Sequence, residues 1–421
     1  MSATEPRPET ETETETEMEM EMEMEMEMEM EAGPDRSMTD YDIVVIGAGI
    51  AGASLAHALL HAPGSMPRLL LLEREAQPGL HSTGRSAAMF MASYGPPQAR
   101  ALTRASRAFY EQPPPGFTET PILSPRGALY PGWQGQEHLL DATEASLRAT
   151  GTAIERLDAA ATLRRVPALR ADGLAGALWE PDAMDVDVHA LHQGYLRGAR
   201  RQGAVVMCDS ELATAARDAD GWRLTLADGR ILRTRQLVNA AGAWADTVAG
   251  RCGSLPAGLQ PKRRSAFTFD PPAEQSVGAH GHAVWRDWPV TGAIDDSWYF
   301  KPDAGQLLGS PANADPVDAH DVMPEELDIA IGIAAIEADT TLRIRRPRRT
   351  WAGLRTFSPD GELVIGFDAA GLFWLAGQGG YGIQSAAGAA ALAASLLRGE
   401  PLPEALRQHG VVPALMAPRG G

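Results

Sequence analysis

The chain has 421 residues and a formal net charge of −18 at pH 7, with 37 Lys and Arg against 55 Asp and Glu. This acidic balance argues against a general nucleic-acid binder, and two cysteines are too few for a disulfide framework. The length suffices for about two domains with a sizeable core, which we expect to work in a reducing cytoplasm.

The first 37 residues are an acidic tail in which Glu alternates with Thr and then with Met. Such a run repels itself and buries too little apolar surface to fold, so the sequence predicts a disordered tail over residues 1–37. The tail lacks the basic start and the apolar core of a signal peptide. Its alternative explanation is an extended start site, because Met38 stands just before the first expected strand.

A strand, a glycine-rich turn and a helix are expected over residues 42–60. Residues 42–46 are a short apolar, β-branched run, as a buried parallel strand requires. Gly47, Gly49 and Gly52 then follow in G-x-G-x-x-G spacing, which lets the backbone approach a pyrophosphate at the N-terminus of a helix. This pattern predicts a dinucleotide-binding site.

A second apolar run ends at Glu73, which lies 21 residues after Gly52. A carboxylate at this distance is placed to accept hydrogen bonds from a ribose. Glu75 is the alternative acceptor.

The segment RSAAMFMASYG, residues 85–95, has neither the period of a surface helix nor the alternation of a strand. Its only charge is Arg85, and Met89 and Met91 flank a phenylalanine. Its residues alone are compatible with a packed core or with the lining of a site.

Two histidines, His189 and His192, have the i, i+3 spacing of one helix face. No third ligand accompanies them, and neither Cys208 nor Cys252 has metal-binding spacing, so we expect an exposed amphipathic helix and no metal site. The basic run at residues 343–350 has no interleaved aromatic residues, which favours a solvated face or internal ion pairs over a nucleic-acid interface.

Two glycine-rich segments return late in the chain, at residues 237–246 and 360–397. Residues 369–397 carry no charge, but several glycines interrupt them, so we predict a strand, a turn and a helix over 382–397 rather than a membrane span. The N-terminus of that helix suits the anionic pyrimidine edge of a reduced flavin. Gathering the first and last segments around one cofactor favours FAD over a nicotinamide cofactor.

The GAGIAG turn, together with VNAAGAWAD, LQPKRRSAF, TWAGLR and GQGGYGIQ, resembles the D-amino-acid oxidase-like FAD-dependent oxidoreductases, and in particular the bacterial D-arginine dehydrogenases. The resemblance covers about residues 41–419. It implies an α/β fold with a Rossmann-like FAD-binding domain, a second domain with a mixed sheet, and non-covalent FAD. It also implies oxidation of a D-amino acid to an imino acid, which water hydrolyses to a 2-oxo acid and ammonia.

The resemblance also implies domain boundaries. The FAD-binding domain is discontinuous, the substrate domain lies between its parts, and a short tail ends the chain. The ranges are 38–115, 185–255 and 346–412 for the FAD-binding domain, 116–184 and 256–345 for the substrate domain, and 413–421 for the C-terminal tail.

Matched position by position, Arg264 and Arg355 would clamp the substrate carboxylate, as bidentate guanidinium groups do. Tyr94 and Tyr299 would contact the substrate, and the Gly380 carbonyl would accept a bond from its amine. The positions matched to cofactor-binding residues are Gly47, Gly49, Ile50, Ala51, Gly52, Glu73, Arg74, Ser82, Thr83, Ser86, Ala87, Ala241, Gly242, Gly379, Gly380, Tyr381, Gly382, Ile383 and Gln384.

The chain departs from the family pattern at three positions. The resembled enzymes have histidine at Met89, threonine at Met91 and a guanidinium-binding glutamate at Ala128. Methionine adapts to irregular apolar ligands, and a buried cation needs a paired carboxylate. These changes predict a preference for neutral or apolar D-amino acids, unless Glu119 in the preceding segment restores the charge.

Other functions fit part of the sequence. They are a D-arginine or D-lysine dehydrogenase, an oxidase of secondary amines on the same fold, an NAD-dependent dehydrogenase, and a non-catalytic FAD-binding module. We expect a monomer or weak oligomer that binds a small molecule, with the electron acceptor left open.

The acidic tail is expected to be dispensable, because nothing in it can pack or bind the cofactor. A chain that begins at Met38 should therefore keep its FAD and its turnover, measured by flavin absorbance and steady-state kinetics. Loss of bound FAD on truncation would show instead that the tail has a structural role.

Overall fold

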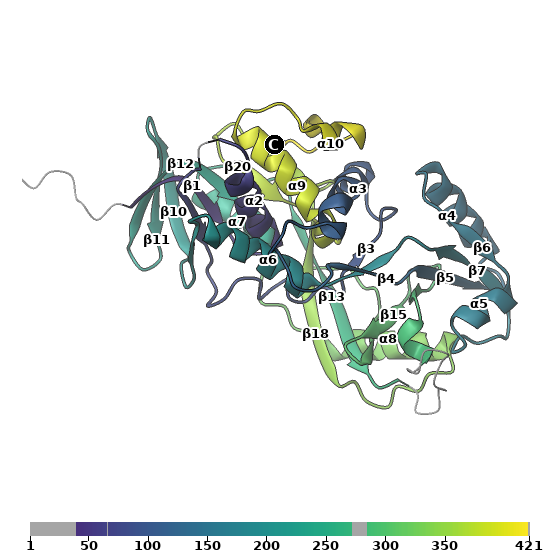
Figure 1. Ribbon diagram of the computed structural model, residues 1–421. Helices are drawn as coiled ribbons and strands as arrows, with labels where there is room; N and C mark the ends of the chain where they lie inside the picture. The colour runs from purple at the N-terminus through teal and green to yellow at the C-terminus, as the bar shows by residue number, and fades with distance from the viewer. Residues whose placement is uncertain (1–38, 65, 272–283, 420–421) are drawn as a thin grey trace, which may run out of the picture.

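The computed structural model describes residues 39–64, 66–271 and 284–419, so the tail predicted over residues 1–37 lies outside the described residues. Two large β-sheets form two lobes, and helices cover their faces (Figure 1). This is the predicted α/β architecture with a second, mixed-sheet lobe.

The first sheet has the order β10-β11-β12-β1-β2-β9, with β20 paired to the end of β12 and β19 paired to β20. Strands β20, β12, β1, β2 and β9 run parallel to one another. The strands are β1 (Thr39–Ile46), β2 (Leu69–Leu72), β9 (Val205–Met207), β10 (Leu212–Asp218), β11 (Gly221–Leu226), β12 (Ile231–Asn239), β19 (Val364–Phe367) and β20 (Phe373–Ala376).

Both faces of this sheet are covered, as its apolar strands require. Ile43 and Val45 of β1 belong to the core beneath α2, α3, α6 and α9, and Val44 and Ile46 belong to the core beneath α7. These helices are α2 (Ile50–His61), α3 (Pro97–Glu111), α6 (Val188–Arg201), α7 (Ala245–Arg251) and α9 (Gly382–Leu397). Helix α9, from the end of the chain, packs against both α2 and α3 (Figure 1).

The second sheet has the order β17-β13-β16-β15-β14-β5-β7-β6, and β18 pairs along the other edge of β13. The strands are β5 (Ala128–Trp133), β6 (Glu155–Leu157), β7 (Leu174–Glu180), β13 (Gln260–Phe269), β14 (Val290–Gly292), β15 (Tyr299–Asp303), β16 (Gln306–Ser310), β17 (Asp315–Pro316) and β18 (Arg349–Phe357). A small third sheet consists of β3 (Met89–Phe90), β8 (Met184–Val186) and β4 (Leu123–Pro125). Its strands pair with one another and with neither large sheet.

Apart from the 3-10 turn η1 (Gly242–Trp244), which precedes α7 in the first lobe, the remaining helices belong to the second lobe or follow α9. They are α4 (Glu137–Ala149), α5 (Ala159–Arg165), α8 (Glu326–Asp339), α10 (Glu404–Gln408) and the short 3-10 turns η2 (Val284–Asp287) and η3 (Pro413–Leu415).

The two faces of the second sheet differ in chemistry. Side chains alternate along each strand, and directly paired residues share a face. Phe267, Phe300 and Leu129 therefore share one face, where they form a core with Ile336 of α8. The opposite face carries the polar residues of the candidate site.

The helices and strands predicted from short sequence patterns are confirmed. The strand at residues 42–46, the helix after it, and the strand, turn and helix over residues 369–397 are all present. Among the described residues, no helix has the length and apolar character needed to cross a bilayer. Strand β18 lies in the range 346–412 expected for the first domain, yet it pairs with β13 of the second sheet.

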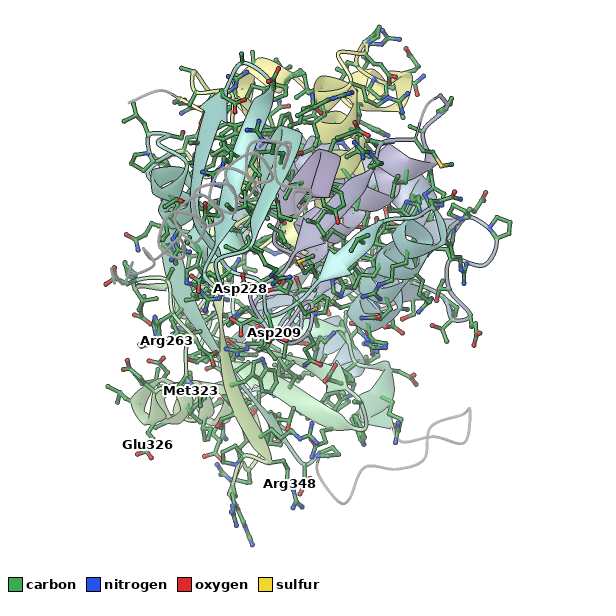
Figure 2. The ribbon with its side chains drawn as sticks, turned by 90° about the vertical axis from the view of Figure 1, so that its left-hand side faces the viewer. Asp209, Asp228, Arg263, Met323, Glu326 and Arg348 are labelled. Atoms are coloured by element: carbon green, nitrogen blue, oxygen red, sulfur yellow. The ribbon has the colours of Figure 1, made fainter. Side chains whose placement is uncertain are left out.

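The basic run at residues 343–350 is solvated, as expected. Arg348, at the tip of the second lobe, bonds both carboxylate oxygens of Asp270 (Figure 2).

Candidate active site

The glycine turn after β1 brings backbone segments into close contact. Gly47 has a φ of +101°, and a Cβ there would lie 2.5 Å from the Ala240 carbonyl oxygen. A Cβ at Gly52 would lie 1.9 Å from the Gly47 carbonyl oxygen. Backbone cannot move aside as a flexible side chain can, so both positions require glycine. Gly49 is the N-cap of α2 and lines a pocket, so the N-terminus of α2 opens onto that pocket.

Glu73, at the end of β2, is buried and anchors this turn. One carboxylate oxygen accepts a hydrogen bond from the Ala48 N–H, and the other accepts one from the Glu75 N–H, each at 3.1 Å. Further lone pairs are available for the predicted ribose contact. The alternative, Glu75, instead bonds Arg74 and His81, each at 2.8 Å.

His192 supports the same turn from α6. Its Nε2 lies 2.8 Å from the Ala48 carbonyl oxygen, and the residue is 4 % exposed. Burial lowers the pKa of His192. The expectation of an exposed helix face is therefore correct for His189, which is exposed, and wrong for His192.

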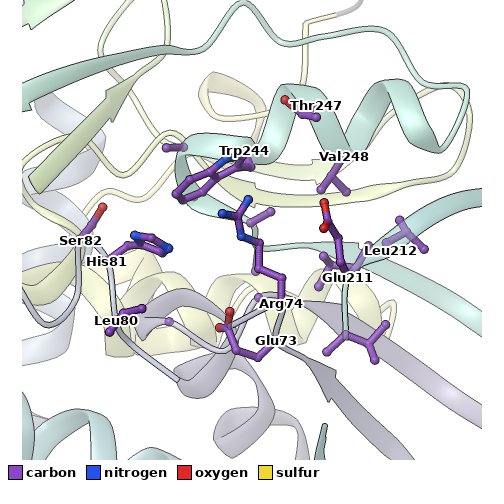
Figure 3. A pocket seen from close by; sticks show the side chains of 18 of the residues that line it. Glu73, Arg74, Leu80, His81, Ser82, Glu211, Leu212, Trp244, Thr247 and Val248 are labelled. Carbon is purple, nitrogen blue, oxygen red and sulfur yellow. The ribbon is translucent and has the colours of Figure 1, made fainter. Parts of the chain in front are cut away.

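A pocket opens at the carboxyl ends of β1, β2 and β12 (Figure 3). Arg74 extends across it, and its Cζ lies 4.2 Å from the centroid of the Trp244 ring, on which His81 also packs at 4.7 Å. The predicted cofactor residues that line it are Gly47, Gly49, Glu73, Arg74, Ser82, Thr83, Ala241 and Gly242. The carboxyl ends of parallel strands are where nucleotides bind in α/β sheets.

Two further cofactor positions lie in the first turn of α2. Ile50 donates its N–H to Thr83 Oγ1 at 3.0 Å, and Ala51 follows it on the buried side of the helix. These contacts fix the loop that contains Ser82 and Thr83 against the glycine turn.

Arg264 and Arg355 extend from the polar face of the second sheet. Arg264 is paired with Gly353, and Arg355 is paired with Lys262, so the two arginines are diagonal neighbours on β13 and β18. Burial and the nearby charge of Arg355 lower the pKa of Arg264. Their hydrogen bonds go to the Asn313 carbonyl and the Tyr94 hydroxyl, and the Asp296 carboxylate, whose pKa is raised by burial, interacts electrostatically with both arginines.

Arg263, which lies between Lys262 and Arg264 in the sequence, faces the opposite side of the sheet. It forms ion pairs with Asp315, Glu325 and Asp328 on the face of the sheet that α8 covers. Strand alternation therefore places Lys262 and Arg264 on one face of the sheet and Arg263 on the other.

Arg355 is surrounded by aromatic rings and by backbone. Its Cζ lies 5.8 Å from the Tyr94 ring centroid and 5.5 Å from that of Phe357. A Cβ at Gly380 would lie 1.7 Å from an Arg355 Nη atom, so only glycine allows this approach. Tyr299 lies on the same sheet face, and with Tyr94 it opposes part of the lowering of the Arg264 pKa that burial and Arg355 cause.

The segment before α9 lies beside Arg355 and its aromatic neighbours. Gly379 has a φ of +49° and donates its N–H to the Thr356 carbonyl at 2.8 Å. The buried Tyr381 hydroxyl bonds the Gly361 carbonyl. Helix α9 then begins with Gly382, Ile383 and Gln384.

The segment 85–95 is tied to both lobes. Gln384 accepts the Met91 N–H at 3.1 Å and donates to the Tyr94 carbonyl at 3.2 Å. Arg85 donates to the Ala352 carbonyl of β18 at 3.2 Å, and Ser86 and Ala87 lie between Arg85 and β3. This segment therefore lies between the start of α9 and β18.

Ser82 connects the nucleotide pocket to the arginine cluster. It lines the pocket, and its hydroxyl donates to the Leu354 carbonyl at 2.6 Å, next to Arg355. The predicted residues thus form two neighbouring groups.

The residues expected to set the substrate side chain are placed as follows. Met89 is half-buried and pairs with Asp185, whereas Glu119 lies on an exposed loop. Ala128 is fully buried and pairs directly with Glu180 of β7, so the two side chains share the polar face of the sheet. Sequence reasoning missed Glu180, because a pairing between strands 52 residues apart has no local signal.

Within residues 39–64, 66–271 and 284–419, no group of three or more His, Cys, Asp and Glu side chains is arranged to hold a metal ion.

The profile of the family described as DAO, FAD dependent oxidoreductase, matches residues 42–396. The bifunctional protein MnmC of tRNA 5-methylaminomethyl-2-thiouridine biosynthesis, from Polaromonas sp., is 26 % identical over 401 residues. That match covers 87 % of this chain and 59 % of MnmC, so the chain spans less than two thirds of that relative.

Solved structures share the fold. Glycine oxidase from Geobacillus kaustophilus superposes with a TM-score of 0.74 at 20 % identity, over 90 % of this chain and 98 % of that enzyme. Iminodiacetate oxidase from Chelativorans sp. BNC1 superposes with a TM-score of 0.70 at 21 % identity, over 89 % of this chain and 98 % of that enzyme.

Proposed function

Because the chain belongs to the DAO family of FAD-dependent oxidoreductases, we propose that it oxidises a D-amino acid with non-covalently bound FAD. The imino acid product would be hydrolysed by water to a 2-oxo acid and ammonia.

The described residues fit FAD. The pocket lies beside the glycine turn, where a Cβ at Gly47 or Gly52 would meet backbone, and the N-terminus of α2 favours a pyrophosphate. The Gln378 Nε2 is buried and has no hydrogen-bond partner among the described residues, so it offers a donor close to the start of α9. A bound FAD supplies a hydride acceptor, and the protein supplies orientation and charge.

The pair of Arg264 and Arg355 carries the proposal. The two neighbouring guanidinium groups repel each other, the part-buried Asp296 carboxylate interacts electrostatically with both, and a substrate carboxylate would bond both directly. A carboxylate held there would lie beside Tyr94 and the Gly380 backbone. In this arrangement the Gly380 carbonyl accepts a hydrogen bond from the substrate amine, and Tyr94 and Tyr299 border the substrate.

For the side chain, Ala128, Met89 and Met91 support a neutral or apolar group. The alternative is a cationic side chain, which the Glu180 carboxylate opposite Ala128 favours. Ala128→Glu would place two carboxylates directly opposite each other, which destabilises a strand pair.

An oxidase of secondary amines is the second candidate. It is supported by the likeness to iminodiacetate oxidase, whose named substrate is a secondary amine with a carboxylate. The same arginine pair would bind that carboxylate, so the geometry of the clamp does not separate the two candidates.

An anaerobic substrate panel separates them. We expect D-methionine, D-leucine and D-phenylalanine to bleach the flavin absorbance faster than D-arginine or D-lysine, because the Glu180 carboxylate opposite Ala128 is already bonded by the Ser93 and Tyr130 hydroxyl groups. N-methylglycine, iminodiacetate and the L-enantiomers serve as controls.

A preference for D-arginine of about tenfold or more in kcat/KM, equal to about 1.4 kcal/mol, would reject the neutral side chain. Bleaching by secondary amines alone would reject the D-amino acid. A flavin that no compound bleaches would point to a non-catalytic module.

A further inference from the structure

We propose that Glu180 is a positioning residue: its buried carboxylate holds, through Ser93, the turn that carries Tyr94, and so sets how Tyr94 meets Arg355. This inference rests on the proposed function, which assigns Tyr94 and Arg355 to the substrate carboxylate.

Glu180 is the last residue of β7 and is 1 % exposed. Its Oε2 accepts hydrogen bonds from the Ser93 hydroxyl at 2.8 Å and the Tyr130 hydroxyl at 3.2 Å. Burial raises the pKa of Glu180, and these two hydrogen bonds oppose that rise. A buried carboxylate is costly unless it is bonded, so the ionised form depends on both hydroxyl groups.

The environment of Glu180 explains the alanine at position 128. Ala128 and Tyr130 lie on the same face of β5, and Ala128 is directly opposite Glu180. A larger residue at position 128 would occupy the space beside the carboxylate, and an acidic one would repel it. Ala128 and Glu180 therefore belong to one arrangement.

Ser93 and Tyr94 stand in the turn between β3 and α3, which has bonds to both lobes. On the first lobe, the Tyr94 carbonyl accepts a bond from Gln384. Towards the second sheet, two side-chain bonds are present within the described residues, from Ser93 to Glu180 and between Tyr94 and Arg355.

These two bonds hold the turn at separate strands, since β7 and β18 are far apart in the strand order. Tyr94 is 40 % exposed, so packing alone does not fix its ring. Without the bond from Ser93 to Glu180, the turn would keep one attachment to the second sheet, and the Tyr94 hydroxyl would sample positions away from Arg355.

The test measures binding of benzoate, a carboxylate with no amine to oxidise, to the FAD-loaded protein by its perturbation of flavin absorbance. Ser93→Ala is expected to raise the Kd for benzoate about tenfold, as the loss of one hydrogen bond to a charged group allows. Glu180→Gln keeps an acceptor for both hydroxyl groups and should stay within about twofold of wild type.

The double variant Ser93→Ala with Tyr94→Phe is expected to bind benzoate no more weakly than Tyr94→Phe alone, because the positioned hydroxyl is already absent. Ser106→Ala is the matched control: it removes a buried serine bond to the Gly388 N–H in α9 and should lower Tm without changing the Kd.

Two results would overturn the role of Glu180. One is a Kd for benzoate that Ser93→Ala leaves unchanged, and the other is a tenfold rise of that Kd when Ser93→Ala is added to Tyr94→Phe. Arg355→Met separates this failure from that of the proposed function. If Arg355→Met binds benzoate as tightly as wild type, the carboxylate clamp itself is wrong.

Discussion

Replacing Arg355 or Arg264 by methionine is expected to weaken binding of an amino-acid substrate by about 2–5 kcal/mol, the usual effect of breaking a desolvated charge pair. Methionine keeps most of the side-chain volume and removes only the guanidinium group. Apparent KM should rise strongly, while the ratio of FAD to protein should not change, because neither arginine lines the nucleotide pocket.

Arg349→Met is the matched control. Arg349 is at the start of β18, in the same strand as Arg355, but it is exposed. Its replacement should leave KM within about twofold, as a solvated surface charge does. Unaltered kinetics in both Arg355→Met and Arg264→Met would contradict the clamp.

Gly52→Ala is expected to weaken FAD binding strongly. The added Cβ would lie 1.9 Å from the Gly47 carbonyl oxygen, and the turn can relieve this contact only by moving the backbone that approaches the pyrophosphate. Occupancy, measured as flavin absorbance per protein after purification, should fall about tenfold or more, because overpacking a tight contact costs about 1–3 kcal/mol.

Two glycines provide a graded comparison. A Cβ at Gly49 would lie 3.2 Å from a side-chain atom, Thr83 Oγ1, so Gly49→Ala should reduce occupancy less. A Cβ at Gly250, in α7, would meet no described atom within 4 Å, and Gly250→Ala should stabilise the protein by about 0.5–1 kcal/mol. Full FAD occupancy in Gly52→Ala would show that the turn is more adaptable than its contacts imply.

The parts of the fold predicted from sequence are those with local causes. The turn at Gly47 follows a strand and precedes a helix, and glycine and proline follow the end of α9 directly. Both elements could therefore be predicted from neighbouring residues alone. The pocket residue Trp244 and the role of His192 beneath the glycine turn were missed because their contacts join segments more than 100 residues apart.

The arginine cluster shows a second reason. In the run that contains Arg263 and Arg264, composition alone makes every basic residue look exposed. Only the alternation along β13 and its pairing with β18 separate an Arg263 that faces α8 from an Arg264 that faces the site. In the same way, Ala128 suggests a missing charge until the register places Glu180 beside it.

The position of α9 has a consequence for biosynthesis. This helix packs between α2 and α3, yet it is made near the end of the chain. On the ribosome, the apolar surfaces of α2 and α3 therefore wait for more than 250 residues before their partner emerges. Domains usually fold as units in the order of synthesis, but here the first lobe can close only after the second has been made. The packing of α2 and α3 is consequently completed only after the residues of the second lobe have been made.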